Sequence, residues 1–159
     1  QNIFQELLAP IEKNYDLILI DCPAMLGKLV TAIAAYSDFV LCPLNPESFS
    51  IQGLEIFKKE IKSINAAYNI NVQYKAFLNK FEASTILSEG TVNESLTKEI
   101  KNGSAFDIVV KKSQEIPNAQ DKKKTLFSTI KKSDVRDDFL LLTIKTIGFD
   151  LSNNSLQKR

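Results

Sequence analysis

The sequence lacks histidine and tryptophan altogether and has only two cysteines, one methionine and five glycines among its 159 residues. Without histidine, neither a zinc site with mixed cysteine and histidine ligands nor a histidine-based catalytic triad can be built. The apolar runs at 17–20 and 139–142 are far shorter than the roughly 20 residues that cross a bilayer. The sequence therefore predicts a soluble protein without a membrane span, a zinc centre or a histidine-dependent hydrolase site.

The composition is that of an ordinary globular protein, with 44% hydrophobic and 25% charged residues. No internal repeat, low-complexity tract or flexible linker divides the chain. We expect a single domain over 1–150, followed by a polar tail at 151–159. Residues 152–159 contain one apolar side chain, Leu156, so they cannot form the apolar face that an amphipathic membrane anchor requires.

Helical and strand patterns alternate along the chain, which is typical of a parallel sheet with right-handed helical crossovers. The predicted fold class is α/β, with a doubly wound parallel sheet and helices on both faces. The segment at 113–132 is expected to be loop and short helix. Apolar periodicity and turn residues predict helices at 3–11, 26–33, 48–68, 91–101 and 134–147, and strands at 17–20, 38–43, 72–79 and 106–110.

Asp21 directly follows the apolar run Leu17–Ile20. Four consecutive branched side chains leave no polar face, so this run is expected to be a buried strand. Asp21 would then emerge at the carboxyl end of the sheet, where open α/β sheets bind ligands. A lone carboxylate at that place suits Mg²⁺, although Asp21 is equally able to cap the turn that begins at Pro23.

Several segments in order carry a family resemblance. They are the run 15–23, the strand that ends at Pro43, the helix start Ile51-Gln52-Gly53-Leu54, the strand Phe77-Leu78-Asn79-Lys80-Phe81, and the stretches 113–120 and 124–127. Together these segments resemble the ParA/Soj/MinD branch of P-loop ATPases and cover most of the chain. The resemblance implies a P-loop NTPase fold of the deviant Walker A class.

The resemblance also implies a nucleotide site. Asp21 stands at the Walker B position, where it would hold a Mg²⁺-bound water at the catalytic centre. Asn79 is similar to the family's adenine-recognising Asn, and Lys80 beside it would belong to the nucleotide-binding residues. The implied cofactors are ATP and Mg²⁺. From the sequence alone, Asn79 remains open to a second interpretation as a strand-end turn residue.

The glycine-rich phosphate loop of the family is missing from these 159 residues. No two of the five glycines are neighbours, and none precedes a Lys-Ser or Lys-Thr pair. We therefore expect the chain to be the carboxyl-terminal part of a ParA-like ATPase whose phosphate-binding segment lies upstream. On its own, such a part is expected neither to bind ATP well nor to hydrolyse it.

Charge is distributed unevenly. Residues 1–60 carry four basic and eight acidic side chains, whereas residues 98–136 carry ten basic and five acidic ones. Lysines cluster at 111–112, 122–124 and 131–132, a pattern typical of sequence-independent phosphate contacts and also of a solvated surface. The resemblance implies nonspecific DNA binding in this region, and we predict DNA contacts by Lys111, Lys112, Lys131 and Lys132.

For the complete protein the resemblance implies a plasmid or chromosome partition ATPase of the cytoplasm, acting at the nucleoid. It would form an ATP-dependent homodimer and bind a centromere-binding ParB-like partner. Two departures from the family pattern are Ala24, in place of a second Pro, and Asp134, at an often basic position. The competing hypothesis is a non-enzymatic ParA-like module that binds DNA or a partner without nucleotide, and the upstream coding sequence distinguishes the two.

Overall fold

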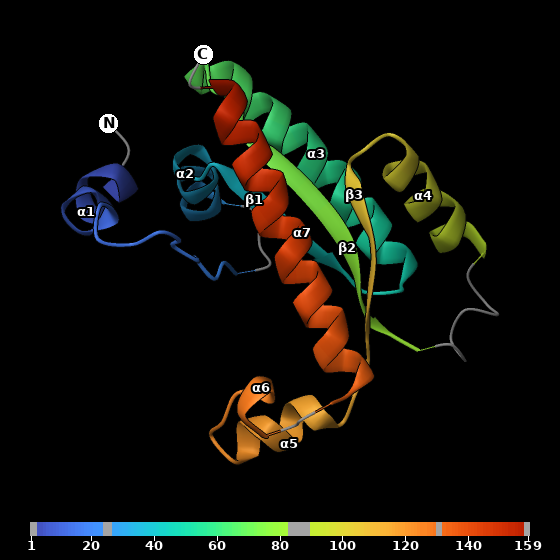
Figure 1. Cartoon of the computed structure of the whole chain (residues 1–159). Helices are drawn as coiled ribbons and strands as arrows, with labels where there is room; N and C mark the ends of the chain where they lie inside the picture. Colours follow the sequence, from blue (N-terminus) through green and yellow to red (C-terminus); the bar gives the residue numbers. More distant parts are fainter. Residues whose placement is uncertain (1–2, 24–26, 83–89, 130–131, 158–159) are drawn as a thin grey trace. The chain divides into compact units, whose positions relative to one another are not determined.

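The computed structural model describes residues 3–23, 27–82, 90–129 and 132–157 (Figure 1). By contacts, the chain divides into two compact units. Unit 1 comprises 1–40 and 53–74, and unit 2 comprises 41–52 and 75–159. The elements in chain order are α1 (Ile3–Glu12), α2 (Lys28–Tyr36), β1 (Phe39–Leu44), α3 (Ser48–Tyr68), β2 (Gln73–Phe81), α4 (Gly90–Lys101), β3 (Ala105–Lys111), α5 (Glu115–Asp121), α6 (Leu126–Thr129) and α7 (Asp134–Gln157).

The described strands form a three-stranded sheet in the order β1-β2-β3, and β2 pairs with β3 in parallel. Each strand is reached from the one before it through a helix, α3 after β1 and α4 after β2. Parallel strands need such crossovers because a tight turn cannot return the chain to the same edge of the sheet. The predicted α/β class with a parallel sheet is therefore confirmed.

Unit 1 has its own small core, which joins α2, α3 and the residues that lead into β2. The buried members are Ala34, Ile61, Ile64 and Val72. The Asn65 side chain fixes the turn after α3, since its Oδ1 accepts the Val72 N–H at 2.9 Å and its Nδ2 donates to the Val72 carbonyl at 3.2 Å. This pair of bonds satisfies the Val72 backbone before the β-ladder begins.

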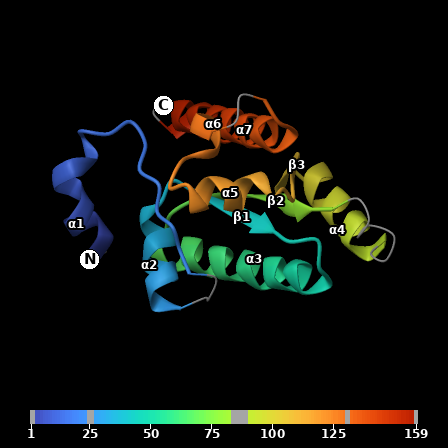
Figure 2. The same ribbon diagram turned by 90° about the horizontal axis from the view of Figure 1, so that it is seen from below.

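Unit 2 is built around the pairing of β2 with β3. Figure 2 shows α7 on one side of these strands and α4 on the other. The centre of β2 is buried at 76–78, and α4 and α7 contribute Leu96 and Leu142 to the buried set. Both faces of a parallel pair must be covered because its strands are apolar on both sides.

The prediction of a buried strand in the N-terminal region is wrong. Residues 17–20 form no strand, and Leu19 is 84% exposed. The apolar side chains of α1, Ile3, Leu7 and Ile11, are exposed as well, and the helix has no buried residue. A four-residue apolar run becomes a buried strand only where neighbouring strands pair with its backbone, and within the described ranges the sheet contains β1, β2 and β3 alone.

The terminal helix is longer than predicted, since α7 extends from Asp134 to Gln157. Leu142 is buried, whereas Ile147 is 42% exposed. These two residues are five positions apart, which is roughly 140° around a helix, so they cannot both face β3. Tyr68 is exposed at the last position of α3. Among the described residues, no helix is both long enough and apolar enough to traverse a membrane.

The Asn65 contacts give a test of unit 1. Replacing Asn65 with Ala leaves the Val72 N–H and carbonyl without their side-chain partner, so we expect the free energy of unfolding to fall by about 1–3 kcal/mol. Urea denaturation of the full gene product measures this loss. Asn118→Ala, at an exposed position of α5, is the control and should change stability by less than about 0.5 kcal/mol. Equal stabilities of the two variants would contradict the assigned contact.

Candidate functional site

The carboxyl ends of β2 and β3 lie side by side in unit 2. The Lys112 N–H donates to the Phe81 carbonyl at 2.9 Å, which continues the pairing past the end of β3. Asn79 and Lys80 precede Phe81 on one strand, and Lys111 precedes Lys112 on the other. The structure therefore brings four of the sequence-predicted site residues to one edge of the sheet, the edge at which open parallel sheets bind ligands.

A β-bulge lies within this edge at Lys80. Leu78 pairs with Val109 and Phe81 with Lys111, so three steps along β2 match two along β3. Lys80 takes up the extra residue with a φ of +54°, in the left-handed region that side chains other than Gly rarely adopt. Such bulges occur frequently next to functional sites because they redirect the neighbouring side chains. Here Lys80 is exposed and Asn79 is half-buried.

Lys111 is held by the first two turns of α7. Its Nζ lies 3.0 Å from Asp134 Oδ2 and 4.0 Å from Asp138 Oδ1. Its backbone N–H also donates to Asp138 Oδ2 at 3.1 Å. The hydrogen bond to Asp134 raises the pKa of Lys111, and the negative charge of Asp138 adds to this effect. Lys111 thus joins the end of β3 to the N-terminus of α7.

The other predicted DNA-contacting lysines differ in their surroundings. Lys112 pairs with Glu82, with 2.9 Å between Nζ and Oε1, and both side chains are largely exposed. Lys132 is exposed just before α7, and Lys131 lies outside the described residues. Lysines 111 and 112 are therefore already matched with carboxylates before any ligand binds.

Asp21 belongs to unit 1, whereas the carboxyl ends of β2 and β3 belong to unit 2. It is exposed in the irregular segment after α1. Desolvation raises the pKa of the neighbouring Cys22 thiol, and the negative charge of Asp21 adds to this effect. The described part of the chain contains no group of three or more acidic or cysteine side chains that could hold a metal ion. A single exposed carboxylate nevertheless fits Mg²⁺, which usually keeps several waters and binds one or two carboxylates together with substrate phosphates.

The turn between α5 and α6 carries three exposed lysines, Lys122, Lys123 and Lys124, which were not among the predicted site residues. The Lys123 N–H donates to the Gln120 carbonyl at 2.8 Å, and the Lys124 N–H donates to the Ala119 carbonyl at 3.0 Å. Lys123 has a φ of +53°, so it occupies the left-handed position that commonly ends a helix. The sequence signal was the lysine triplet itself.

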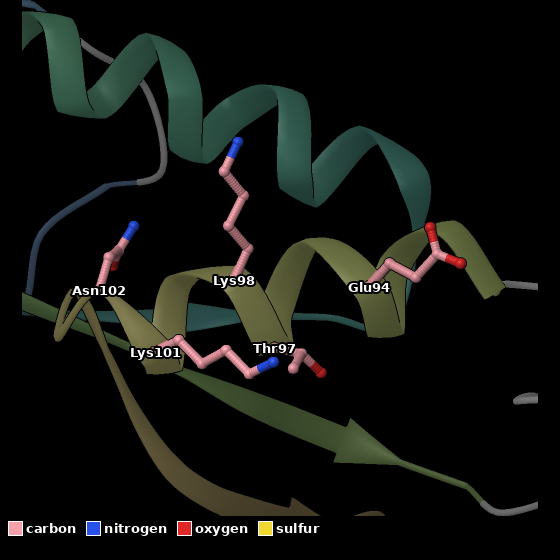
Figure 3. A pocket seen from close by; sticks show the side chains of 5 residues that line it. All are labelled: Glu94, Thr97, Lys98, Lys101 and Asn102. Atoms are coloured by element: carbon pink, nitrogen blue, oxygen red, sulfur yellow. The ribbon is translucent and has the colours of Figure 1, made fainter.

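A surface hollow on unit 2 is lined by residues of α4 and the turn after it: Glu94, Thr97, Lys98, Lys101 and Asn102. Figure 3 shows these side chains spread along the helix and its last turn. No predicted site residue lines this hollow, so it is separate from the edge of β2 and β3.

Comparisons with known proteins find ParA-type relatives for part of the chain. Residues 1–74 match the family model described as AAA domain. The chain is 30% identical over 94 residues to the chromosome-partitioning ATPase Soj of Treponema pallidum. The matched stretch covers 58% of this chain and 37% of that protein. It is also 30% identical over 91 residues to the chromosome partitioning protein ParA of Myxococcus xanthus, covering 57% of this chain and 32% of that protein. These matches make the chain similar to ParA-type P-loop ATPases.

The chain is also 31% identical over 112 residues to an uncharacterised protein of Pseudomonas putida, and the matched stretch covers 70% of this chain and 42% of that protein. The chain thus spans less than half the length of these relatives. Asp21 lies within the residues that the family model matches, whereas the lysines of β3 and the α5–α6 turn lie beyond them. The predicted ParA resemblance is confirmed.

The bulge at Lys80 gives a test of the site geometry. Gly adopts positive φ without the steric penalty of a side chain, so Lys80→Gly should raise the free energy of unfolding by about 0.5–1 kcal/mol. The matched control is Lys62→Gly in the interior of α3, which should lower it by about 1 kcal/mol. Thermal denaturation of the full gene product compares the two. A loss of stability in Lys80→Gly as large as in the control would contradict the left-handed conformation of Lys80.

Proposed function

We propose that this chain is part of a ParA-type partition ATPase that uses ATP and Mg²⁺ to control dimerisation and nonspecific DNA binding. The observation that carries this proposal is the 30% identity with Soj and ParA proteins over a stretch of more than 90 residues. The parallel sheet supports it, because its carboxyl edge carries polar and basic side chains where nucleotides bind in such folds.

In the proposed site, Asp21 holds a water in the shell of Mg²⁺. Asn79 recognises the adenine edge, since its amide offers both a donor and an acceptor, and Lys80 contributes positive charge on the nucleotide side. Mg²⁺ bound with ATP would neutralise the charge that develops on the transferred phosphoryl group. The 159 residues contain no glycine-rich phosphate loop, so the proposal requires that another segment of the complete protein supplies it.

The proposed DNA surface lies on the basic part of unit 2 and includes Lys111, Lys112, Lys131 and Lys132. The complete protein would dimerise with ATP, bind DNA without sequence preference, and respond to a centromere-binding ParB-like partner. Its place of action would be the cytoplasm, at the nucleoid. The printed names of the relatives support the partition role, since two of them are chromosome-partitioning proteins.

A second candidate function is a non-enzymatic ParA-like module that binds DNA or a protein partner without nucleotide. The absence of a glycine-rich loop from these 159 residues favours it. The coding sequence upstream of Gln1 separates the two candidates. A Lys-Gly-Gly loop in the same frame supports the ATPase, and a start codon just before Gln1 supports the module.

Asp21 provides the direct test of the ATPase. Asp21→Asn in the full gene product keeps the size of the side chain but removes its charge, so the Mg²⁺-dependent rate of ATP hydrolysis should fall by about 100-fold, as expected for the loss of metal-assisted charge stabilisation. A coupled phosphate-release assay at several Mg²⁺ concentrations measures it. Asp16→Asn, in the same segment, should retain the wild-type rate.

The outcomes separate the hypotheses. A wild-type rate in Asp21→Asn would remove Asp21 from the metal site while leaving the ATPase in place. If the unmodified gene product shows no Mg²⁺-dependent hydrolysis and its DNA binding does not depend on ATP, the non-enzymatic module replaces the ATPase.

A further inference from the structure

The helix α7 carries apolar side chains on two opposite sides. On one side Val135 and Leu142 are buried, and α7 contacts β3. On the other side the large apolar side chains are exposed, namely Leu140, Leu141, Ile144 and Ile147. A helix at the surface normally has one apolar side, and a helix that is apolar all round is normally buried. The exposed side of α7 therefore has the character of a contact surface.

The residues of this exposed side form two neighbouring rows along the helix. Residues four positions apart lie next to each other on a helix surface. One row consists of Asp137, Leu141 and Lys145, and the next contains Leu140 and Ile144. The first row has a negative charge at one end, an apolar residue in the middle and a positive charge at the other end. This order makes the row complementary to a copy of itself that runs in the opposite direction.

We infer that this side of α7 packs antiparallel against the same side of α7 in a second copy of the chain. The surface, here called the outer α7 face, comprises Asp137, Leu140, Leu141, Ile144, Lys145 and Ile147. The homodimer under the proposed function depends on ATP. The contact inferred here goes beyond it, because α7 needs no nucleotide to present its outer face.

A two-fold axis at Leu141 would relate the two copies. Symmetric dimers use the same surface on both subunits, so every contact occurs twice. Asp137 and Lys145 are each four positions from Leu141, so Asp137 of either copy lies opposite Lys145 of the other. No ion pair of either side chain is recorded with any residue in the described ranges. The antiparallel direction also brings opposite ends of the two helix dipoles together.

Two other occupants fit the outer α7 face less well. A helix that binds an anionic membrane typically carries Lys and Arg on its polar side. The first two turns of α7 instead contain Asp134, Asp137 and Asp138, which an anionic surface repels. A further segment of the complete protein would bury the apolar residues, but nothing would require it to match the charge order of Asp137 and Lys145. That order favours the second copy.

The contact is expected to be weak. Four partly exposed apolar side chains from each copy give an interface below the roughly 1,200 Å² at which specific, stable complexes begin. Association also costs each copy its freedom to move independently, which a small interface offsets only in part. We therefore expect a Kd in the micromolar range or above, and a dimer whose population depends strongly on protein concentration.

Sedimentation velocity of the full gene product without nucleotide tests the inference, since the ATP-dependent dimer does not contribute under these conditions. The wild-type protein should shift from monomer to dimer as its concentration rises. Ile144→Glu places a carboxylate in the interface and should raise Kd at least about 10-fold. The matched control is Ile56→Glu on α3, because Ile56 is 58% exposed and Ile144 is 60% exposed. The control should leave Kd unchanged.

Charge reversal tests the antiparallel arrangement. Asp137→Lys and Lys145→Glu each bring like charges together twice in the dimer, so each should raise Kd by about 5-fold. The double variant restores opposite charges at both places and should return Kd to near the wild-type value. In a parallel pair of α7 helices these two residues would not meet, so no recovery would occur.

The results separate the inference from its alternatives. A wild-type protein that stays monomeric without nucleotide overturns the inference, and a melting temperature lower in Ile144→Glu than in Ile56→Glu would then indicate cover by another segment of the complete protein. Vesicles of anionic phospholipid bound by a monomeric wild type, but not by Ile144→Glu, would overturn it in favour of a membrane surface. A wild-type Kd in Ile144→Glu, or no recovery in the double variant, also contradicts it.

The proposed function is measured separately, by dimerisation and hydrolysis with ATP and Mg²⁺. Loss of both in the wild-type protein contradicts the proposed function and leaves the α7 contact standing. Ile144→Glu should keep the wild-type rate of hydrolysis, because the outer α7 face contains none of the residues of the proposed nucleotide site.

Discussion

The parallel pairing of β2 with β3 is the constraint on which the described part of unit 2 depends. Parallel strands require a crossover between them, which α4 supplies, and cover on both faces, to which α7 and α4 contribute. Because both strands run the same way, their carboxyl ends coincide. This is why Asn79 and Lys80 lie next to Lys111 and Lys112, although some thirty residues separate them in sequence.

At the same edge, packing changes the effect that a charged side chain has on its surroundings. Asp134 departs from the basic residue often found at its position in the family. In the structure it lies at the first position of α7, where a carboxylate interacts favourably with the helix dipole, and it pairs with Lys111. The departure thus strengthens the attachment of α7 to β3. A count of lysines along the chain therefore overstates the positive charge that a phosphate would meet at Lys111.

The features that sequence could predict are those set by neighbours along the chain. The 3.6-residue apolar period predicted α3, and the Asn102-Gly103 stop predicted the end of α4, because both depend on residues a few positions away. The positions of Asn79, Lys80 and the two lysines at strand ends were predictable for the same reason. The bulge at Lys80 was not, since it depends on how β2 aligns with β3. The pairing of Lys111 with Asp134 could not be predicted either, because it depends on where α7 packs.

The segment 17–20 shows that the residues of a segment do not by themselves predict whether it is buried. Its composition is that of a buried strand, yet Leu19 is almost fully exposed. A strand is buried only when other strands or helices pack against it, and its own residues do not decide this. The relatives contain chain beyond the 32–42% of their length that is matched here, and a strand from such chain would satisfy the backbone of 17–20. Asp21 directly follows this segment, so its position would depend on the same pairing. In the proposed ATPase, the metal site would therefore form only together with the completed sheet.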